Sequence, residues 1–215
     1  MRPVGDHAVL LDLQSNEAVQ AVARLARERF GSELVEIVPG HCTLLLMWDE
    51  RLDDPAALMS NLKALAGDAS AFKLDMRVIG NDRPAVTTVP VRYDGADLEA
   101  VAGQLGVSAE GLVKLHSGGE YTVAFMGFSP GFPYLVAEDG DQVSQLLSLP
   151  RLGTPRTEVP SGSVAVAAGY CGIYPRSSPG GWNLVGRTDA VLFDAQRDPP
   201  ALLQPGTRVR FEPVA

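Results

Sequence analysis

The chain contains 215 residues, of which 46% are apolar and 20% are charged. This composition is typical of a globular protein with one large domain or two small ones, and it argues against low-complexity disorder. The longest apolar runs are far shorter than the roughly 20 residues that a membrane span requires. The N-terminal residues lack the apolar core of a signal peptide, so the sequence predicts a cytoplasmic protein.

The chain is acidic, with 18 basic and 26 acidic residues and a net charge of −8. Such a surface repels phosphate backbones, which argues against a nucleic-acid partner. Cys42 and Cys171 show no C-x-x-C spacing and are expected to be buried, reduced thiols. His7, His41 and His116 lie far apart in the sequence, so no metal site is expected.

Residues 1–83 alternate between strand and helix patterns. Apolar runs typical of strands occur at residues 7–13, 33–38, 42–48 and 73–79. Helical spacing occurs at residues 16–30 and 55–66, and Gly67 is expected to end the second helix. The resulting order β-α-β-β-α-β predicts a ferredoxin-like α/β domain, with a boundary in the polar segment 80–84.

Residues 84–215 show a different pattern. A strand at 86–91 precedes two helical patterns at 97–105 and 109–116, the second with Ser108 as its N-cap. Short apolar runs separated by Gly and Pro then follow at 121–126, 163–168, 172–174, 183–185, 191–193 and 208–211. Many short strands with frequent turns indicate a β-barrel or sandwich, so the predicted fold class is α+β.

Residues 127–131 match the G-x-S-x-G pattern of a hydrolase nucleophile elbow. That motif uses the backbone N–H of the residue after the serine, and Pro130 has none. No histidine follows the serine either, so we reject the catalytic interpretation. A type II turn around Pro130 suits the sequence better, and it leaves Phe128, Phe132 and Tyr134 either to pack on the sheet or to line a pocket.

A second turn element spans residues 178–182. Its paired glycines, Gly180 and Gly181, permit close approach of a ligand and leave backbone N–H groups free to bind an anion. The alternative is a tight corner of the barrel that Trp182 fills.

Residues 150–190 contain four arginines, two acids and no lysine. A guanidinium group binds carboxylate or phosphate with two parallel hydrogen bonds, so Arg151, Arg156, Arg176 and Arg187 form either an anion site or a set of solvated surface charges. His116 lies at a predicted helix-to-strand junction. It is either a general base, an orienting contact to a ligand, or a cap of the helix.

Several multi-residue motifs, taken in order, resemble the KipI / allophanate hydrolase subunit 1 family. They lie at residues 115–116, 121–123, 127–135, 150–156, 159–164, 172–175, 178–182 and 186–188. The resemblance covers nearly the whole chain. It implies an N-terminal α/β domain over residues 1–83 and a C-terminal cyclophilin-like β-barrel over residues 84–215.

The family resemblance implies one of three activities. We expect the first, which is ATP-dependent opening of 5-oxo-L-proline to L-glutamate by a 5-oxoprolinase. The partners of this chain are then the A subunit and the C subunit of that enzyme, and the C subunit is KipA-like. The alternatives are a KipI-type inhibitor of a histidine kinase and a protein associated with allophanate hydrolase or urea carboxylase. ATP is then a co-substrate that binds together with Mg²⁺, and no permanently bound cofactor is expected. The chain alone is expected to be inactive.

Under this interpretation a cleft in the second domain carries the chemistry. Phosphoryl transfer depends mainly on positioning and charge stabilisation, which arginines and backbone N–H groups supply. The residues expected to act in catalysis are His116, Arg151 and Arg156. The residues expected to bind substrate or ATP are Phe128, Gly131, Phe132, Tyr174, Pro179, Gly180, Gly181, Trp182 and Arg187.

Overall fold

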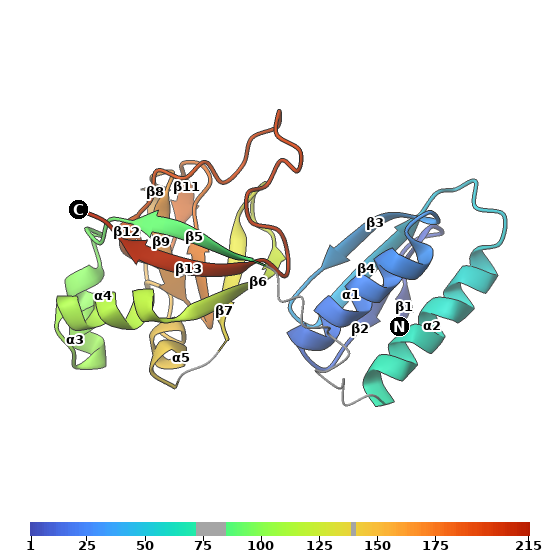
Figure 1. The fold of residues 1–215 in the computed structure, drawn as a ribbon, viewed down its shortest axis with the longest axis horizontal. Helices are drawn as coiled ribbons and strands as arrows, with labels where there is room; N and C mark the ends of the chain where they lie inside the picture. The colour runs from blue at the N-terminus through green and yellow to red at the C-terminus, as the bar shows by residue number, and fades with distance from the viewer. Residues whose placement is uncertain (72–84, 139–140) are drawn as a thin grey trace. The chain divides into compact units, whose positions relative to one another are not determined.

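The computed structural model describes residues 1–71, 85–138 and 141–215 of the chain. The chain divides into two compact units, Met1–Arg83 and Pro84–Ala215, and each unit has its own cluster of buried apolar side chains (Figure 1). None of the helices in the described ranges has both the length and the apolar character that crossing a membrane requires.

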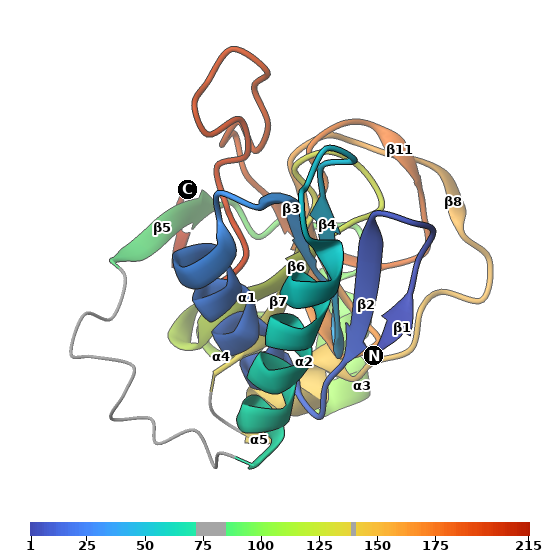
Figure 2. The same ribbon diagram turned by 90° about the vertical axis from the view of Figure 1, so that its right-hand side faces the viewer.

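The first unit contains an antiparallel sheet with strand order β1-β2-β4-β3. Its strands are β1 (Arg2–Pro3), β2 (Ala8–Asp12), β3 (Leu34–Pro39) and β4 (Thr43–Trp48). Helices α1 (Asn16–Phe30) and α2 (Pro55–Ala71) lie side by side (Figure 2) and bury their apolar side chains with those of the sheet. Strand β4 contributes Leu44, Leu46 and Trp48, every second residue, as the pleat of a strand requires.

The predicted bounds of α1 are confirmed, and Ser15 caps it by accepting a hydrogen bond from the Ala18 N–H. The prediction that Gly67 ends α2 is wrong, because the helix continues to Ala71. One glycine inside a helix costs only about 1 kcal/mol, which the buried leucines of α2 offset. The strand predicted at residues 73–79 lies outside the described residues. The short strand β1, which was not predicted, pairs with β2.

The second unit is built on a seven-stranded sheet with strand order β12-β9-β10-β7-β6-β13-β5. The strands are β5 (Val86–Val91), β6 (Glu120–Met126), β7 (Pro133–Ala137), β9 (Ser163–Ala167), β10 (Tyr170–Ile173), β12 (Asn183–Arg187) and β13 (Arg208–Pro213). Strands β13 and β5 are parallel, and the other neighbours are antiparallel. The sheet curls so strongly that its two edge strands, β5 and β12, approach each other. Arg92, directly after β5, and Arg187, at the end of β12, exchange two backbone hydrogen bonds of 2.8 Å.

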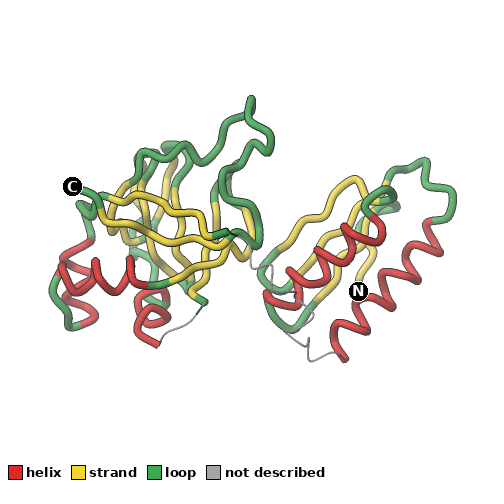
Figure 3. The backbone as a smooth tube through the Cα atoms, viewed as in Figure 1, coloured by secondary structure: helices red, strands yellow, loops and turns green. Residues whose placement is uncertain are grey.

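Three helices gather at one end of the curled sheet, as Figure 3 shows. They are α3 (Leu98–Leu105), α4 (Ala109–Gly118) and α5 (Asp141–Leu147). The N-cap predicted for α4 is confirmed, since the Ser108 hydroxyl accepts a hydrogen bond of 3.1 Å from the Gly111 N–H. Helix α5 was not predicted. The fold is therefore a mixed α/β structure with a strongly curled sheet.

The strand predicted at residues 191–193 is wrong. Phe193 forms one isolated bridge with Ala201 and no ladder. The Arg197 guanidinium donates hydrogen bonds to carbonyl groups of this loop, including those of Val191 and Leu192. The Val191 carbonyl thus accepts from a side chain, while the Leu192 carbonyl also accepts a backbone hydrogen bond of 2.8 Å from the Leu202 N–H. The segment therefore forms a looped turn with single backbone contacts and no strand ladder.

Strand β9 is buried on both faces, and this determines where the site lies. Val164 and Val166 face the main core, whereas Ala165 and Ala167 face a smaller cluster rich in aromatic rings. A short ribbon of β8 (Arg156–Val159) and β11 (Ser178–Gly180) adds Val159 to this second cluster. The sheet thus separates an ordinary apolar core from an aromatic one.

Candidate functional site

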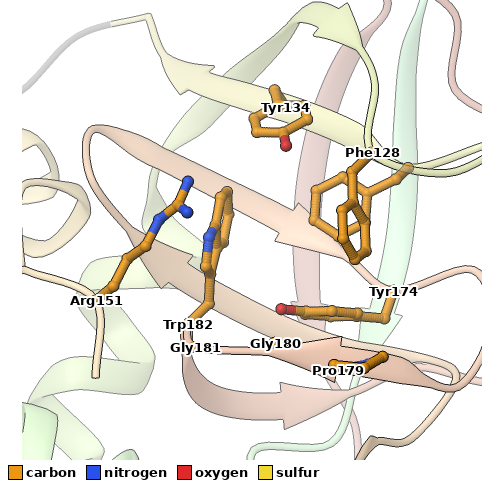
Figure 4. Close-up of a pocket in the computed structure, with 9 residues that line it drawn as sticks. Phe128, Tyr134, Arg151, Tyr174, Pro179, Gly180, Gly181 and Trp182 are labelled. Atoms are coloured by element: carbon orange, nitrogen blue, oxygen red, sulfur yellow. The ribbon is translucent and has the colours of Figure 1, made fainter. Parts of the chain in front are cut away.

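The aromatic cluster forms the wall of a recess with a volume of about 80 Å³, hereafter the aromatic recess. Its lining residues are Phe128, Phe132, Tyr134, Arg151, Tyr174, Pro179, Gly180, Gly181 and Trp182. Figure 4 shows that the hydroxyl groups of Tyr134 and Tyr174 point into the space that the Trp182 ring and the Arg151 guanidinium also border. Apart from Tyr134, every lining residue was among the predicted site residues. Tyr134 was predicted only as packing on the sheet or lining a pocket.

The walls of the aromatic recess consist of rings packed edge to face. Phe132, which is 2% exposed, contacts Tyr174 and Trp182 at centroid distances of 5.1 and 5.7 Å, with both interplanar angles at 89°. This perpendicular geometry places the positive edge of one ring on the negative face of another. The base of the recess is therefore tightly packed. Phe128 lies at the rim and is 61% exposed.

The turn that carries Phe128 is strained. Phe128 has a positive φ of 64°, and the Ser129 N–H donates a hydrogen bond of 2.6 Å to the Gly127 carbonyl, which closes a tight three-residue turn. The type II turn predicted next is confirmed, because the Phe132 N–H donates to the Ser129 carbonyl at 3.0 Å and Gly131 has φ +80°. Backbone strain of this kind costs about 1–3 kcal/mol and is concentrated at ligand-binding sites.

Arg151 supplies the charge of the aromatic recess. Its guanidinium carbon lies 5.9 Å from the centroid of the Trp182 ring, within the range of a cation–π interaction. Burial raises the pKa of the Tyr134 and Tyr174 hydroxyls, although Arg151 opposes this shift. Both hydroxyls therefore remain protonated and able to donate hydrogen bonds. One cation and two hydroxyl donors between apolar rings suit a small cyclic ligand with an anionic group.

The other predicted arginines do not share the aromatic recess. Arg156 forms an ion pair of 2.7 Å with Asp97. Arg187 forms an ion pair of the same length with Asp94 and lines a second cavity of about 380 Å³. These arginines therefore do not form one shared anion site, and Arg151 alone among these three borders the aromatic recess.

His116 lies in the main core and has no exposed surface. Its Nδ1 atom lies 2.7 Å from the Tyr93 hydroxyl, its Nε2 atom lies 3.4 Å from the Cys171 sulfur, and its ring stacks on Phe211. Burial lowers the pKa of His116 to about 3, so the ring is neutral. A fully enclosed ring cannot touch a substrate, which argues against the expected catalytic role of His116.

Two further features bear on the expected site. Gly131 does not line the aromatic recess but packs on the loop after β12, where an added Cβ atom would lie 2.6 Å from the Phe193 Cβ atom. Within the described ranges, no three His, Cys, Asp or Glu side chains are grouped so as to hold a metal ion.

Gly172 on β10 is a residue of the site that the sequence analysis missed. An added Cβ atom would lie 2.8 Å from Phe132 Cζ and 2.9 Å from Trp182 Cζ3, so the backbone itself forms the floor under these rings. We expect Gly172→Ala to lower the free energy of unfolding by about 1–3 kcal/mol, because the rings must move apart. Denaturant unfolding measures this change.

Gly153→Ala is the matched control for Gly172→Ala, because no atom lies within 4 Å of its added Cβ. We expect this control to change the free energy of unfolding by less than about 0.5 kcal/mol. Equal effects of the two substitutions would contradict the close packing described for the floor of the recess.

The chain matches the family model for the carboxyltransferase domain, subdomain C and D, over residues 1–203. It is 37% identical over 219 residues to the B subunit of 5-oxoprolinase from Escherichia coli O157:H7, covering 98% of this chain and 94% of the relative. The identity to the protein of the same name is 35% in Haemophilus influenzae and 32% in Bacillus subtilis, with at least 90% of each relative covered. These matches confirm the family resemblance inferred from the motifs.

Solved structures are also similar to this chain. TTHA0988 is 35% identical with a TM-score of 0.77, and the match covers 98% of this chain but 40% of that longer one. PH0987 from Pyrococcus horikoshii is 33% identical with a TM-score of 0.55, covering 99% and 96% of the two chains. The Kluyveromyces lactis urea amidolyase, at 20% identity and a TM-score of 0.67 over 15% of its length, shares the fold alone.

Proposed function

Because the chain belongs to the carboxyltransferase domain, subdomain C and D family, we propose from its similarity to named relatives that it acts as the B subunit of a cytoplasmic 5-oxoprolinase. The observation that carries this proposal is the similarity to three proteins of that name along at least 97% of this chain. The reaction opens the lactam of 5-oxo-L-proline to give L-glutamate.

The chemistry of the aromatic recess suits this substrate. 5-Oxoproline is a small five-membered lactam with a carboxylate, so Arg151 would pair with the carboxylate while the ring packs against Phe132 and Trp182. The Tyr134 and Tyr174 hydroxyls would donate hydrogen bonds to the lactam carbonyl. Donors at this oxygen withdraw electron density from the amide carbon. Transfer of the ATP γ-phosphoryl group to the same oxygen, with release of ADP, would then let water cleave the C–N bond, with phosphate leaving and the ring nitrogen taking up a proton as the amine of glutamate.

The aromatic recess does not fit ATP with Mg²⁺. Its volume of about 80 Å³ is far below the roughly 300–1,000 Å³ of sites for drug-sized ligands, so it suits a small lactam but not a nucleoside triphosphate. No carboxylate is among its described lining residues, and Mg²⁺ prefers oxygen ligands of that kind. We therefore assign ATP to the assembled complex with the A subunit, the KipA-like C subunit or both. In this proposal the chain is inactive alone, because the co-substrate binds elsewhere.

The proposal includes a finer description of the fold. We assign residues 1–83 to a ferredoxin-like domain, which the order β2-β4-β3 and the two packed helices support. We assign residues 84–215 to a cyclophilin-like β-barrel, which is supported by the backbone bridge between Arg92 and Arg187 at the two edges of the sheet.

The proposed function is tested by reconstituting the complex from this chain and the A and C subunits. ADP release is measured with and without 5-oxoproline, and L-glutamate is quantified in parallel. We expect both products only when 5-oxoproline and all three subunits are present. ADP release that persists unchanged without this chain would refute the assignment. A stable complex with a histidine kinase and no turnover of 5-oxoproline would favour the kinase-inhibitor alternative.

A further inference from the structure

A polar network outside the aromatic recess contacts the backbone at Trp182 and at the residues that follow it. Asp97, which directly precedes α3, lies at its centre, and its side chain is 13% exposed. One carboxylate oxygen of Asp97 lies 2.7 Å from the Arg156 Nη2 atom. The other accepts a hydrogen bond of 2.7 Å from the Leu184 N–H. Both oxygens of this carboxylate are thus engaged by charged or backbone donors.

Arg156 links Asp97 to the ribbon that borders the recess. It lies on β8 opposite Gly180 of β11, and its Nη1 atom donates a long hydrogen bond of 3.5 Å to the Trp182 carbonyl. The Asp97–Arg156 pair therefore contacts the chain at Trp182 and at Leu184, two residues further on. Hydrogen bonds between charged groups that are partly shielded from water are stronger and more geometrically specific than exposed ones.

Asn183, between these two contacts, connects the same segment to the loop that carries Arg151. It is 4% exposed, and its side-chain amide donates hydrogen bonds of 3.0 Å to the carbonyls of both Pro150 and Val166. The Leu152 N–H donates a further bond of 2.7 Å to the Gly181 carbonyl. The backbone on both sides of Arg151 is thus hydrogen-bonded to the segment that contains Trp182.

We propose that Asp97, Arg156 and Asn183 are positioning residues that hold the Arg151 guanidinium and the Trp182 ring in register for binding the anionic group of the ligand. None of the three lines the aromatic recess, so none of them is a catalytic residue. This changes the role of Arg156 from the expected direct contact with substrate to orientation of the groups that touch it. The identity of the ligand in this inference rests on the proposed function, whereas the positioning of Arg151 and Trp182 rests on the structure alone.

The geometry can be tested without substrate, because the chain contains two tryptophans. In a Trp48→Phe background, Trp182 is the remaining tryptophan and its fluorescence reports on the recess. We expect Asp97→Asn, which removes the charge and keeps the size, to increase acrylamide quenching of Trp182 by about twofold. Asp94→Asn is the matched control, because Asp94 forms an ion pair of the same length with Arg187 and lies outside the aromatic recess.

The second measurement uses the reconstituted complex. We expect Asp97→Asn to raise the KM for 5-oxoproline about tenfold while kcat changes by less than about twofold, because one charge-assisted contact is lost and the reacting groups remain. We expect Asp97→Glu to recover part of this loss and Asp94→Asn to leave KM unchanged. If Asp97→Asn does not fold, Arg156→Lys provides the same comparison, since it keeps the charge but loses the planar fork.

The outcomes separate the two proposals. Unchanged Trp182 quenching and an unchanged KM in Asp97→Asn or Arg156→Lys would overturn the positioning role. A lowered melting temperature with neither of these changes would also overturn it, since a merely structural contact gives that result. If the unaltered complex shows no 5-oxoproline-dependent turnover, the proposed function fails, and the quenching measurement still decides whether the network orients Trp182.

Discussion

Replacing Arg151 with alanine is expected to lower kcat/KM for 5-oxoproline about 100-fold in the reconstituted complex. Arg151 is the one charged side chain among the described lining residues, so its loss leaves the substrate carboxylate without a cationic partner. A hydrogen bond to a charged group contributes about 1.5–3 kcal/mol, and the upper value corresponds to roughly this factor. Steady-state ADP release at varied 5-oxoproline concentration measures the change.

Two further variants make the Arg151 prediction specific. Arg151→Lys keeps the charge but cannot form two parallel hydrogen bonds or stack as a planar group on Trp182, so we expect an intermediate loss of about tenfold. Arg176→Ala removes an exposed arginine of the same unit that does not line the recess, and we expect no change. Equal kcat/KM for Arg151→Ala and the unaltered chain would exclude the aromatic recess as the substrate site.

The local part of the site could be predicted from the sequence. The type II turn before Phe132 and the paired glycines before Trp182 follow from steric properties of proline and glycine, which act over a few residues. The aromatic residues beside the first turn were expected either to pack on the sheet or to line a pocket, and Phe128, Phe132 and Tyr134 do line one. Tyr174, which also lines it, was expected only after the family resemblance. Short-range backbone chemistry therefore predicted the turns that shape the recess, and the family resemblance supplied the rest of its lining.

The roles of the charged residues could not be predicted in the same way. Arg156 and Arg151 look equivalent in the sequence, but Arg156 pairs with Asp97, which lies 59 residues earlier in the chain. Likewise, His116 contacts Cys171, which lies 55 residues away. Such pairs are determined by how the curled sheet brings distant segments together, and neither spacing nor periodicity in one sequence contains that information.

Longer-range packing also explains the errors in secondary structure. Helix α5 is short, and its apolar residues Val143, Leu146 and Leu147 become buried only when they pack against the main core of the folded second unit. The run at residues 191–193 is apolar enough for a strand, but it lies in a loop that the Arg197 guanidinium holds by hydrogen bonds to the Val191 and Pro200 carbonyls. In both cases the tertiary environment overrides a weak local preference.

The buried state of His116 predicts that the second unit loses stability in mild acid. The pKa of His116 is about 3 in the folded chain because burial disfavours the charged ring, whereas an unfolded histidine has a pKa of about 6.5. Protonation therefore favours the unfolded state. The stabilisation is fully present above about pH 6.5 and is lost progressively as the pH falls towards 3.

Between pH 7 and pH 5, this linkage lowers the free energy of unfolding by about 2 kcal/mol, because one proton per molecule is taken up on unfolding over most of that range. Urea unfolding followed by Trp182 emission in the Trp48→Phe background measures it in the second unit. His116→Leu destabilises the chain at every pH, since Tyr93 and Cys171 lose their contact, but it should remove most of this pH dependence. His7→Gln, in the first unit, should retain it. A pH dependence of equal size in His116→Leu would mean that another group controls the acid sensitivity of this core.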